Sequence, residues 1–343
     1  MSKESQNKFA EIPGILGMKG WLFAAAVIIF LHFTLQLGLN AYYFQILMFA
    51  GINITLAVSL NLVNGFTGQF SMGHAGFMSV GGYMSSYLTT TYFASNPDML
   101  QNPIISGVIF FFALIAGGVA ATLAGYVVGL PSLRLRGDYL AIVTLGFGEI
   151  IRVLLLNMNI VGGARGLSGI QPLTNFFWVF IFALLTVFCV WRVVHSAKGR
   201  VLLAIREDEI AGTSMGVNTT EGKVWAFSLG AFFAGIAGGL FAHYLTTLNP
   251  GTFDFNRSFE IIIMVVLGGM GSISGSIVAA IFLTLLKEVL RPLQQITGYD
   301  LRMIIYSLVL IGMMLTRPQG IFGTSEITSL FNYFKKRLKR GAP

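Results

Sequence analysis

The stretch Gly199–Lys223, which reads GRVLLAIREDEIAGTSMGVNTTEGK, is the one long run of mixed charge before the C-terminal tail. It lies between two apolar runs, Phe176–Val194 and Val224–Leu245, each long enough to cross a bilayer. Because a charged segment of this kind cannot lie in hydrocarbon, it must protrude into water. Its apolar residues are interleaved with charged ones, a pattern typical of a short helix on the membrane surface. The stretch therefore divides the chain and predicts a docking segment for a soluble partner protein.

The composition places the chain in a membrane. Of its 343 residues, 55% are hydrophobic and only 10% are charged, whereas a soluble domain carries about 25% charged residues. So few charges cannot cover the surface of a soluble globule, so we expect an all-α, polytopic membrane protein surrounded by the lipid bilayer. The net charge of +8 gathers at loops and termini, where it indicates topology and contact with anionic headgroups. No nucleic-acid partner is expected.

The sequence offers no constellation for catalysis or for a cofactor. The four histidines are scattered and the single cysteine, Cys189, lies inside an apolar run, so neither a metal site nor a thiol-based site is expected. The pair Gly222-Lys223 does not end a nucleotide-binding loop, because Val217 stands where the first glycine is required and Val224 replaces Ser or Thr. We therefore expect no catalytic residue, no metal and no cofactor in this chain. If ATP drives it, another chain binds the ATP.

The apolar runs predict about ten transmembrane helices. The block 259–290 has about 32 residues, more than the roughly 20 that one span needs, and glycines at 268–275 interrupt it, so it counts as two. Lysines before the first run, which we expect to be a retained helix, and a basic cluster in the tail place both termini in the cytoplasm. The predicted spans are 21–37, 43–63, a run that ends near 92, 104–128, 139–156, 176–194, 224–245, the two halves of 259–290, and 301–315.

The order of the spans predicts an inverted repeat within a single transmembrane domain that covers residues 1–343. Spans two to five begin outside and spans seven to ten begin inside, and each set holds a polar break, at Gly65–Gly76 and at Asn249–Glu260. Such a repeat, with its glycine-interrupted helices, places a pathway at the repeat interface near the membrane midplane. The predicted segments are a first repeat at 21–156 with an extra N-terminal helix, a linking helix at 176–194, a cytoplasmic coupling loop at 199–223, a second repeat at 224–316 and a basic cytoplasmic tail at 317–343.

Polar and small residues in the two breaks are the candidates for lining that pathway. A broken helix in lipid leaves backbone groups unpaired unless protein or a water-filled cavity supplies partners, and exposed amides there could meet a polar solute. The alternative is that these side chains only cap the half-helices and that the carboxylate in the second break is interfacial or paired. The candidate pathway residues are Gln69, Ser71, Gly73, His74, Ser258 and Glu260. The candidate hinge glycines are Gly65, Gly68, Gly268, Gly269 and Gly271.

Glu149 and Arg152 are predicted to form a charged pair inside the membrane. They stand three positions apart on one face of the fifth span. A charge within a span costs several kcal/mol unless it is paired or hydrated, and such a pair can neutralise itself. We expect a structural pair, and the alternative is a residue that takes part in transport.

Four stretches carry a resemblance to a known family. They are SLNLVNGFTGQFSMGHAGF at 59–77, LRLRGDYLAIVTLG at 133–146, GRVLLAIREDEIA at 199–211 and GGMGS at 268–272. In this order they resemble the permease subunits of bacterial branched-chain amino acid ABC transporters, and within that family the M-type subunit. The resemblance covers nearly the whole chain.

The resemblance implies a multi-pass permease of the bacterial cytoplasmic (inner) membrane that imports leucine, isoleucine or valine. It implies as partners two cytoplasmic ATP-binding subunits, a sister permease that makes a heterodimer, and a periplasmic or extracellular solute-binding protein. Residues 210–216 resemble the EAA-type coupling loop of importers, although Ile210 stands where its glutamate is expected and Glu209 comes one residue earlier. The ATPase-coupling residues that the resemblance implies are Arg206, Glu207, Asp208, Glu209, Ala211 and Gly216.

The expected mechanism is alternating access, in which closing ATPases push on Arg206–Gly216 and the two repeats rock about the glycine breaks. A urea or amide importer is built on a similar plan and remains an alternative for the solute. A stand-alone ion-coupled carrier would need Glu149 as its intramembrane carboxylate and leaves the charged stretch without a role. An intramembrane enzyme would need a nucleophile–base or metal constellation, which the sequence does not offer.

Overall fold

The structure is a computed structural model that describes residues 18–38, 40–133, 135, 138–291, 302–317 and 319–323. Most of the predicted basic tail, from residue 324 onward, lies outside these residues. The described part is almost wholly helical, and five of its helices are long and apolar enough to cross a membrane. They are Ala41–Phe66, Pro103–Ser132, Tyr139–Asn157, Phe176–Val194 and Thr219–Leu245. The all-α, polytopic class predicted from composition is therefore confirmed.

A helix occupies each apolar run that the sequence predicted as a span. The helices are α2 Met18–Gly38, α3 Ala41–Asn61, α4 His74–Ser95, α5 Asp98–Gln101, α6 Pro103–Ser132, α7 Asp138–Asn157, α8 Phe176–Val194, α9 Ala197–Glu207, α10 Glu209–Ser214, α11 Thr219–Leu245, α12 Phe255–Gly268, α13 Ile273–Val289 and α15 Arg302–Thr316. Short elements are η1 Leu62–Phe66, η2 Asn159–Val161, η3 Gly163–Arg165, η4 Pro250–Phe253 and the strands β1 Leu167–Ser168 and β2 Thr247–Leu248. Because α12 ends at Gly268 and α13 begins at Ile273, the interruption predicted within 259–290 is confirmed.

Three predicted boundaries are wrong by more than a turn. Helix α6 ends at Ser132, four residues after the predicted end at 128. Helix α12 begins at Phe255, four residues before the predicted start at 259, so Ser258 and Glu260 lie in this helix and not in the predicted break. Helix α11 begins at Thr219, five residues before the predicted start at Val224. The side-chain oxygen of Asn218 accepts a hydrogen bond from the backbone N–H of Glu221 at 3.1 Å, which caps the helix. The hydropathy of the sequence rises only after Lys223. A helix start predicted from apolar residues therefore misses the polar, capped first turn of α11.

Close backbone contacts hold α4, α6 and α11 together. Each of these three helices packs extensively on the other two. A Cβ atom on Gly235 of α11 would lie 2.9 Å from the carbonyl oxygen of Gly117 in α6. Small residues at such positions let membrane helices approach closely. Gly235 is therefore a position where α6 and α11 pack closely.

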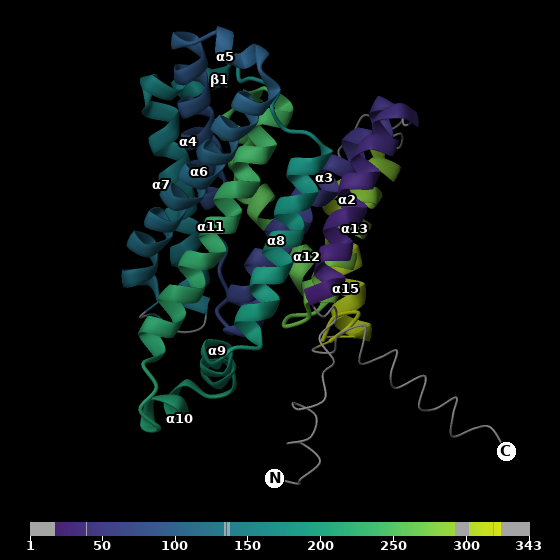
Figure 1. Cartoon of the computed structure of the whole chain (residues 1–343). Coiled ribbons are helices and arrows are strands. Elements are labelled where there is room, and N and C mark those ends of the chain that lie inside the picture. Colours follow the sequence, from purple (N-terminus) through teal and green to yellow (C-terminus); the bar gives the residue numbers. More distant parts are fainter. Residues whose placement is uncertain are drawn as a thin grey trace, which may run out of the picture.

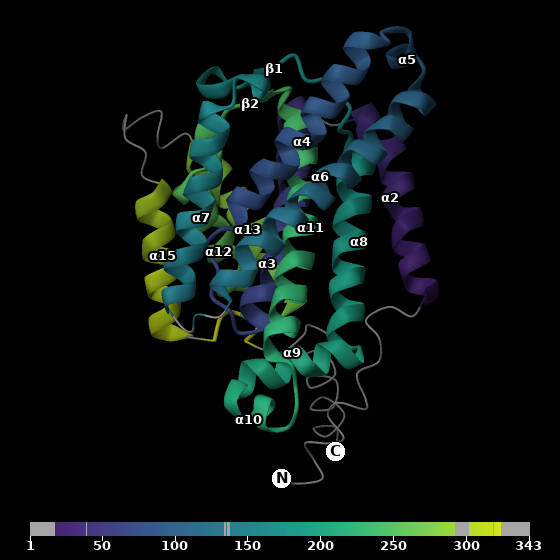
Figure 2. The ribbon, with the colours of Figure 1, turned by 90° about the vertical axis from the view of Figure 1, so that its left-hand side faces the viewer.

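A second group of helices forms around α3, most of whose residues are buried. Helix α3 packs on α13, α12 and α8, and α11 contacts α3 and so joins the two groups. Figures 1 and 2 show the long helices running roughly alongside one another, with α9 and α10 beyond one end of the bundle and α5, β1 and β2 at the opposite end. The charged stretch that contains α9 and α10 therefore protrudes from the helical bundle, as the sequence predicted.

Candidate functional site

The two polar breaks bring two helix beginnings together inside the fold. Helix α4 begins at His74 after the first break, and α12 begins at Phe255 after the second. The backbone N–H of Ala75 donates to Oγ of Ser258 at 3.4 Å, so the first turns of the two helices touch. The N–H groups of a first helical turn carry partial positive charge. The partially positive first turns of α4 and α12 therefore meet at the contact between Ala75 and Ser258.

Gly73 and His74, at the end of the first break, are tightly held. Nε2 of His74 and Oγ of Ser59 in α3 lie 2.9 Å apart, and both side chains are buried. A Cβ atom on Gly73 would lie 2.6 Å from the carbonyl oxygen of Thr144 in α7, so only glycine fits there. Each residue therefore has a packing role, and neither caps the start of α4 with a side chain.

Gln69 and Ser71 stand out in the same break because their polar groups lack partners. Both side chains are buried, and among the described residues neither the amide of Gln69 nor the hydroxyl of Ser71 has a hydrogen-bond partner. Leaving a buried polar group unpaired costs about 1–3 kcal/mol. Asn64 and Thr144, which the sequence analysis did not single out, hold the backbone instead: Asn64 Oδ1 accepts from Ser71 N at 3.1 Å and Thr144 Oγ1 accepts from Met72 N at 3.0 Å.

Asn61, the last residue of α3, joins the first break to the interruption between α12 and α13. Its Oδ1 accepts from Gly271 N at 2.9 Å, and its Nδ2 donates to the carbonyl of Ser272 at 2.9 Å. The side chain is fully buried. The sequence analysis missed this residue, although an asparagine in an otherwise apolar span is the signal that could have found it.

Arg206 of α9 contacts the same junction from the protruding segment. Its Nη1 donates to the carbonyl oxygen of Gly65 at 3.2 Å. Cβ atoms on Gly68 and Gly271 would meet the Arg206 side chain at 2.9 and 2.8 Å, and both glycines have positive φ angles, +72° and +93°. That backbone conformation favours glycine. Three of the predicted hinge glycines thus lie around the side chain of Arg206.

The other two predicted hinge glycines lie one step away from Arg206. A Cβ atom on Gly268 would meet backbone atoms of Gly275 at 2.5 Å, which brings the end of α12 against the start of α13. Gly269 has φ +113° and lies against the backbone of Gly323. Gly268 and Gly269 thus lie at the point where α12 ends and the chain turns toward α13.

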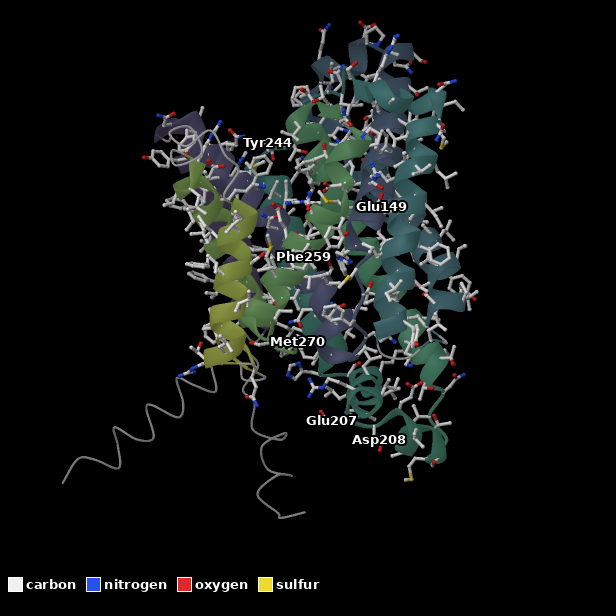
Figure 3. All side chains as sticks on the ribbon, turned by 180° about the vertical axis from the view of Figure 1, so that it is seen from behind. Glu149, Glu207, Asp208, Tyr244, Phe259 and Met270 are labelled. Atoms are coloured by element: carbon white, nitrogen blue, oxygen red, sulfur yellow. The ribbon has the colours of Figure 1, made fainter. Side chains whose placement is uncertain are left out.

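The acidic residues of the protruding segment stabilise the segment's own structure. Oδ1 of Asp208 accepts from the backbone N–H groups of Ile210 and Ala211 at 2.9 and 3.0 Å and so caps α10. Glu209 forms an ion pair of 2.7 Å with the buried Lys223 at the start of α11. Figure 3 places Glu207 and Asp208 at the far end of the molecule.

Two apolar side chains are exposed at the tip of the segment. Ile210 is 66% exposed and Met215 is 84% exposed. Gly216 follows with a φ of +81° and ends α10. Since α9 and α10 protrude from the bundle, these side chains are presented to whatever lies beyond that end of the molecule.

Glu149 and Arg152 pair with each other, as their spacing predicted. The distance from Arg152 Nη2 to Glu149 Oε2 is 2.7 Å. Both side chains remain about one-third exposed on α7, and Figure 3 shows Glu149 on this outlying helix. The pair lines neither of the two main cavities of the described structure.

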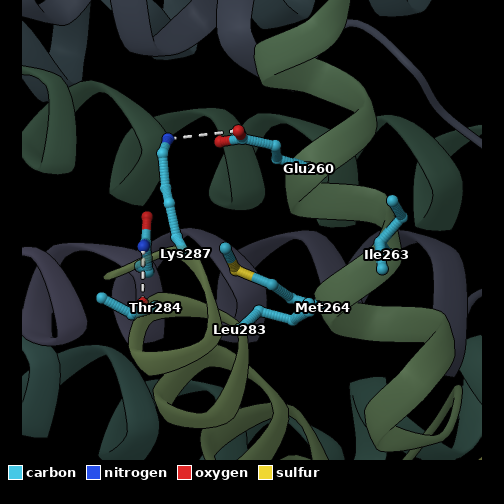
Figure 4. Close-up of a pocket in the computed structure, with 7 residues that line it drawn as sticks. Glu260, Ile263, Met264, Leu283, Thr284 and Lys287 are labelled. Carbon is cyan, nitrogen blue, oxygen red and sulfur yellow. Dashed lines mark hydrogen bonds and ion pairs between the residues drawn. The ribbon is translucent and has the colours of Figure 1, made fainter. Parts of the chain in front are cut away.

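A polar cavity lies between α3, α12, α13 and the last turns of α11, toward the end opposite α9. Glu260 lies in its wall between two cations, with Arg257 Nη1 at 2.9 Å and Lys287 Nζ at 3.2 Å. Glu260 is therefore a paired carboxylate, as one of the two alternatives predicted. A smaller cavity beneath shares Asn53, Glu260, Thr284 and Lys287, and Figure 4 shows the Lys287–Glu260 and Asn53–Thr284 contacts.

The sequence of the chain is similar to those of known transport permeases. A family model described as the permease component of the branched-chain amino acid transport system matches residues 42–316. The high-affinity branched-chain amino acid transport system permease proteins LivM of Salmonella typhimurium and of Escherichia coli are each 36% identical over 310 residues, which cover 79% of this chain and 67% of theirs. The corresponding LivH protein of Salmonella typhimurium is 25% identical over 306 residues, covering 83% of this chain and 97% of its own. No solved structure shows significant similarity.

Proposed function

Since this chain belongs to the family of permease components of branched-chain amino acid transport systems, we propose that it forms the membrane path of an ATP-driven importer for leucine, isoleucine and valine, together with a sister permease. It is a multi-pass transport subunit of the membrane and not an enzyme. The observation that carries the proposal is the contact of Arg206, in a segment that protrudes from the membrane domain, with both the first break and the interruption between α12 and α13. A force applied to that segment would act directly on the part of the fold where helices are interrupted.

Ten spans and an inverted repeat are part of this proposal. The first break follows α3 at the end of the bundle where α9 lies, and the second follows α11 at the opposite end, near β1 and β2 (Figure 2). Both breaks lead inward to helices whose first turns touch, at Ala75 and Ser258. This arrangement supports two repeats of opposite orientation and a pathway between them. With α9 and α10 in the cytoplasm, both termini would lie on the cytoplasmic side.

The tip of the protruding segment would be the docking point for one of two cytoplasmic ATP-binding subunits. Exposed apolar side chains at Ile210 and Met215 can enter an apolar pocket of a partner, whereas Asp208 and Glu209 keep α10 folded and attached to α11. ATP would bind to the partners, and their closure would move α9. Arg206 would then pass the movement to the glycines of the first break and of the interruption between α12 and α13.

The sister permease would cover the outer face of α7. A partly exposed ion pair such as Glu149–Arg152 is costly against lipid, so contact with another protein chain would stabilise it. Gly146 on this helix is exposed, with nothing within 4 Å of a Cβ atom placed there, so a second helix can approach. Disulfide cross-linking between Gly146→Cys and cysteines in the sister permease tests this placement. Cross-links that form only from the opposite side of the bundle, for example from Leu285→Cys, would exclude it.

The experiment that tests the proposed function is uptake by vesicles that contain the purified chain, its sister permease, the ATP-binding subunits and a matching solute-binding protein. L-leucine, L-isoleucine, L-valine and urea are offered with and without ATP. We expect uptake of the three amino acids that requires ATP. Uptake of urea alone would favour the amide-type importer, and uptake by this chain alone under a proton or sodium gradient would favour the ion-coupled carrier and move Glu149 to its centre.

A further inference from the structure

The polar cavity next to Glu260 has the walls of a small-molecule site. Its volume is about 280 Å³, close to the roughly 300 Å³ at the lower end of known ligand sites. It lies between α11 of the first group of helices and α3, α12 and α13 of the second group. The residues that line it are Phe49, Asn53, Phe241, Leu245, Thr252, Asp254, Asn256, Arg257, Glu260, Thr284, Lys287 and Glu288.

Two cations in the wall share one carboxylate. Glu260 pairs with Arg257 at 2.9 Å and with Lys287 at 3.2 Å. The other two carboxylates are engaged elsewhere: Asp254 caps α12 by accepting from Arg257 N at 3.1 Å, and Glu288 accepts from the hydroxyl of Tyr42 at 3.1 Å and pairs with Arg291 at 3.5 Å. Neither Arg257 nor Lys287 therefore has a carboxylate to itself.

Lys287 has spare hydrogen-bonding capacity on the cavity side. Its ammonium group can donate three hydrogen bonds, and among the described residues its one hydrogen-bond partner is Glu260. The side chain is 39% exposed. Arg257 is less free, because Nη2 also donates to Asn53 Oδ1 at 2.9 Å. Lys287 is thus the cation that can turn toward a ligand.

Apolar groups line the same cavity. Phe49 and Phe241 have ring centroids 6.1 Å apart, and Leu245 follows one turn later on α11. These groups can cover an aliphatic side chain, while the charged wall holds polar groups. A cavity in which two cations share one carboxylate beside an apolar wall matches an apolar amino acid in its zwitterionic form.

We propose that this cavity binds the zwitterion of a branched-chain amino acid by insertion between Lys287 and Glu260. The ammonium group of Lys287 leaves Glu260 and donates to the α-carboxylate of the ligand. Glu260, still paired with Arg257, accepts from the ligand's α-ammonium group. The number of opposite-charge contacts rises from two to three, and the net charge of the wall does not change. The proposal rests on the proposed function, because it assigns a binding site to the solute of that importer.

The test uses a reporter cysteine in the full assembly, reconstituted in lipid nanodiscs without the solute-binding protein. Leu245→Cys is introduced together with Cys189→Ser, and its modification by a small neutral methanethiosulfonate is timed with and without L-leucine. We expect L-leucine to slow the reaction, while leucinamide, which has no carboxylate, and isovalerate, which has no ammonium group, do not. Adding Lys287→Gln should raise the half-protecting concentration of L-leucine about tenfold or more, since a hydrogen bond between charged groups is lost.

Arg291→Gln is the matched control. Arg291 lies one turn beyond Lys287, pairs with Glu288 at 3.5 Å and is absent from the cavity wall, so its replacement removes the same charge nearby while every residue of the wall is kept. Protection should persist in this variant. Unchanged protection in Lys287→Gln, or no protection at all while the parent assembly still takes up L-leucine with ATP, would overturn the proposed site. Failure of ATP-driven L-leucine uptake in the parent would instead count against the proposed function, so the two failures are distinguishable.

Discussion

Arg206 and Gly65 stand 141 positions apart in the sequence, yet the guanidinium of Arg206 donates to the carbonyl oxygen of Gly65 at 3.2 Å. The hydrogen bond joins a protruding helix to a break inside the membrane domain. Arg206 also lies against Gly68 and Gly271. One side chain therefore contacts both the first break and the interruption between α12 and α13. Arg206 is thus the residue at which to test how ATP hydrolysis and transport are connected.

Replacing Arg206→Gln should uncouple the two processes. Losing a hydrogen bond from a charged donor costs about 1.5–3 kcal/mol, so we expect solute transported per ATP hydrolysed to fall about tenfold or more. Uptake and ATP hydrolysis are measured in the same vesicles. The control is Arg200→Gln, which removes the same charge from an exposed position on α9. An unchanged ratio in Arg206→Gln would rule out the coupling role.

Replacing Asn61→Ala should destabilise the junction between the first break and the interruption between α12 and α13. The backbone N–H of Gly271 would lose its hydrogen-bond partner in a buried place, at about 1–3 kcal/mol, whereas the carbonyl of Ser272 would keep its hydrogen bonds from Ser276. We expect the thermal unfolding midpoint of the assembly in detergent to fall by several degrees. Asn157→Ala, which removes an exposed hydrogen bond to Val153, is the control and should leave the midpoint in place. Equal midpoints for both variants would contradict the role given to Asn61.

Removing the apolar tip should weaken binding of the ATP-binding subunits. In the double variant Ile210→Ser, Met215→Ser the helices α9 and α10 keep their caps but lose the exposed apolar surface. We expect the ATP-binding subunits to be lost during co-purification, because buried apolar anchors dominate the binding energy of an interface. Ile160→Ser, at a position 70% exposed at the opposite end, serves as the control. Full recovery of the ATP-binding subunits with the double variant would exclude the tip as the docking point.

Replacing Gly235→Ala should disturb the packing of α11 on α6. The added methyl group would lie 2.5 Å from the Cβ atom of Ala121, and overpacking of this kind costs about 1–3 kcal/mol. We expect a lower yield of folded protein and a lower thermal unfolding midpoint. Gly312→Ala is the matched control, because nothing lies within 4 Å of a Cβ atom there. If the two variants prove equally stable, close approach of α6 and α11 is not required.

The sequence predicted those parts of the fold that depend on local signals. Apolar runs gave every helix that fills a predicted span, and the glycines at 268–271 gave the interruption between α12 and α13. The i, i+3 spacing of Glu149 and Arg152 gave their ion pair. Each of these follows from hydrophobicity or from helical geometry alone.

The contacts that make up the candidate site could not be predicted in this way. Asn61 reaches Gly271 across 210 positions, and Arg257 reaches Asn53 across 204. Such pairs are set by how the helices pack, which a single sequence read along its length does not reveal. Gln69 and Ser71 are predicted to line the pathway, but only the structure reveals that their polar groups are buried and have no hydrogen-bond partner in the part of the chain that it describes.

Helix α11 runs without interruption from the buried Lys223 to Phe241 and Leu245 in the cavity wall. Lys223 forms an ion pair with Glu209 of the protruding segment. The 27 residues of α11 make a rod roughly 40 Å long. A tilt of about 5° around the middle of such a rod moves its two ends by roughly 2 Å in opposite directions. A small rotation that shifts the Lys223 end of α11 therefore changes the width of the cavity at the Leu245 end. In the proposed importer, binding in the cavity and binding of the ATP-binding subunits would then influence each other through one rigid helix.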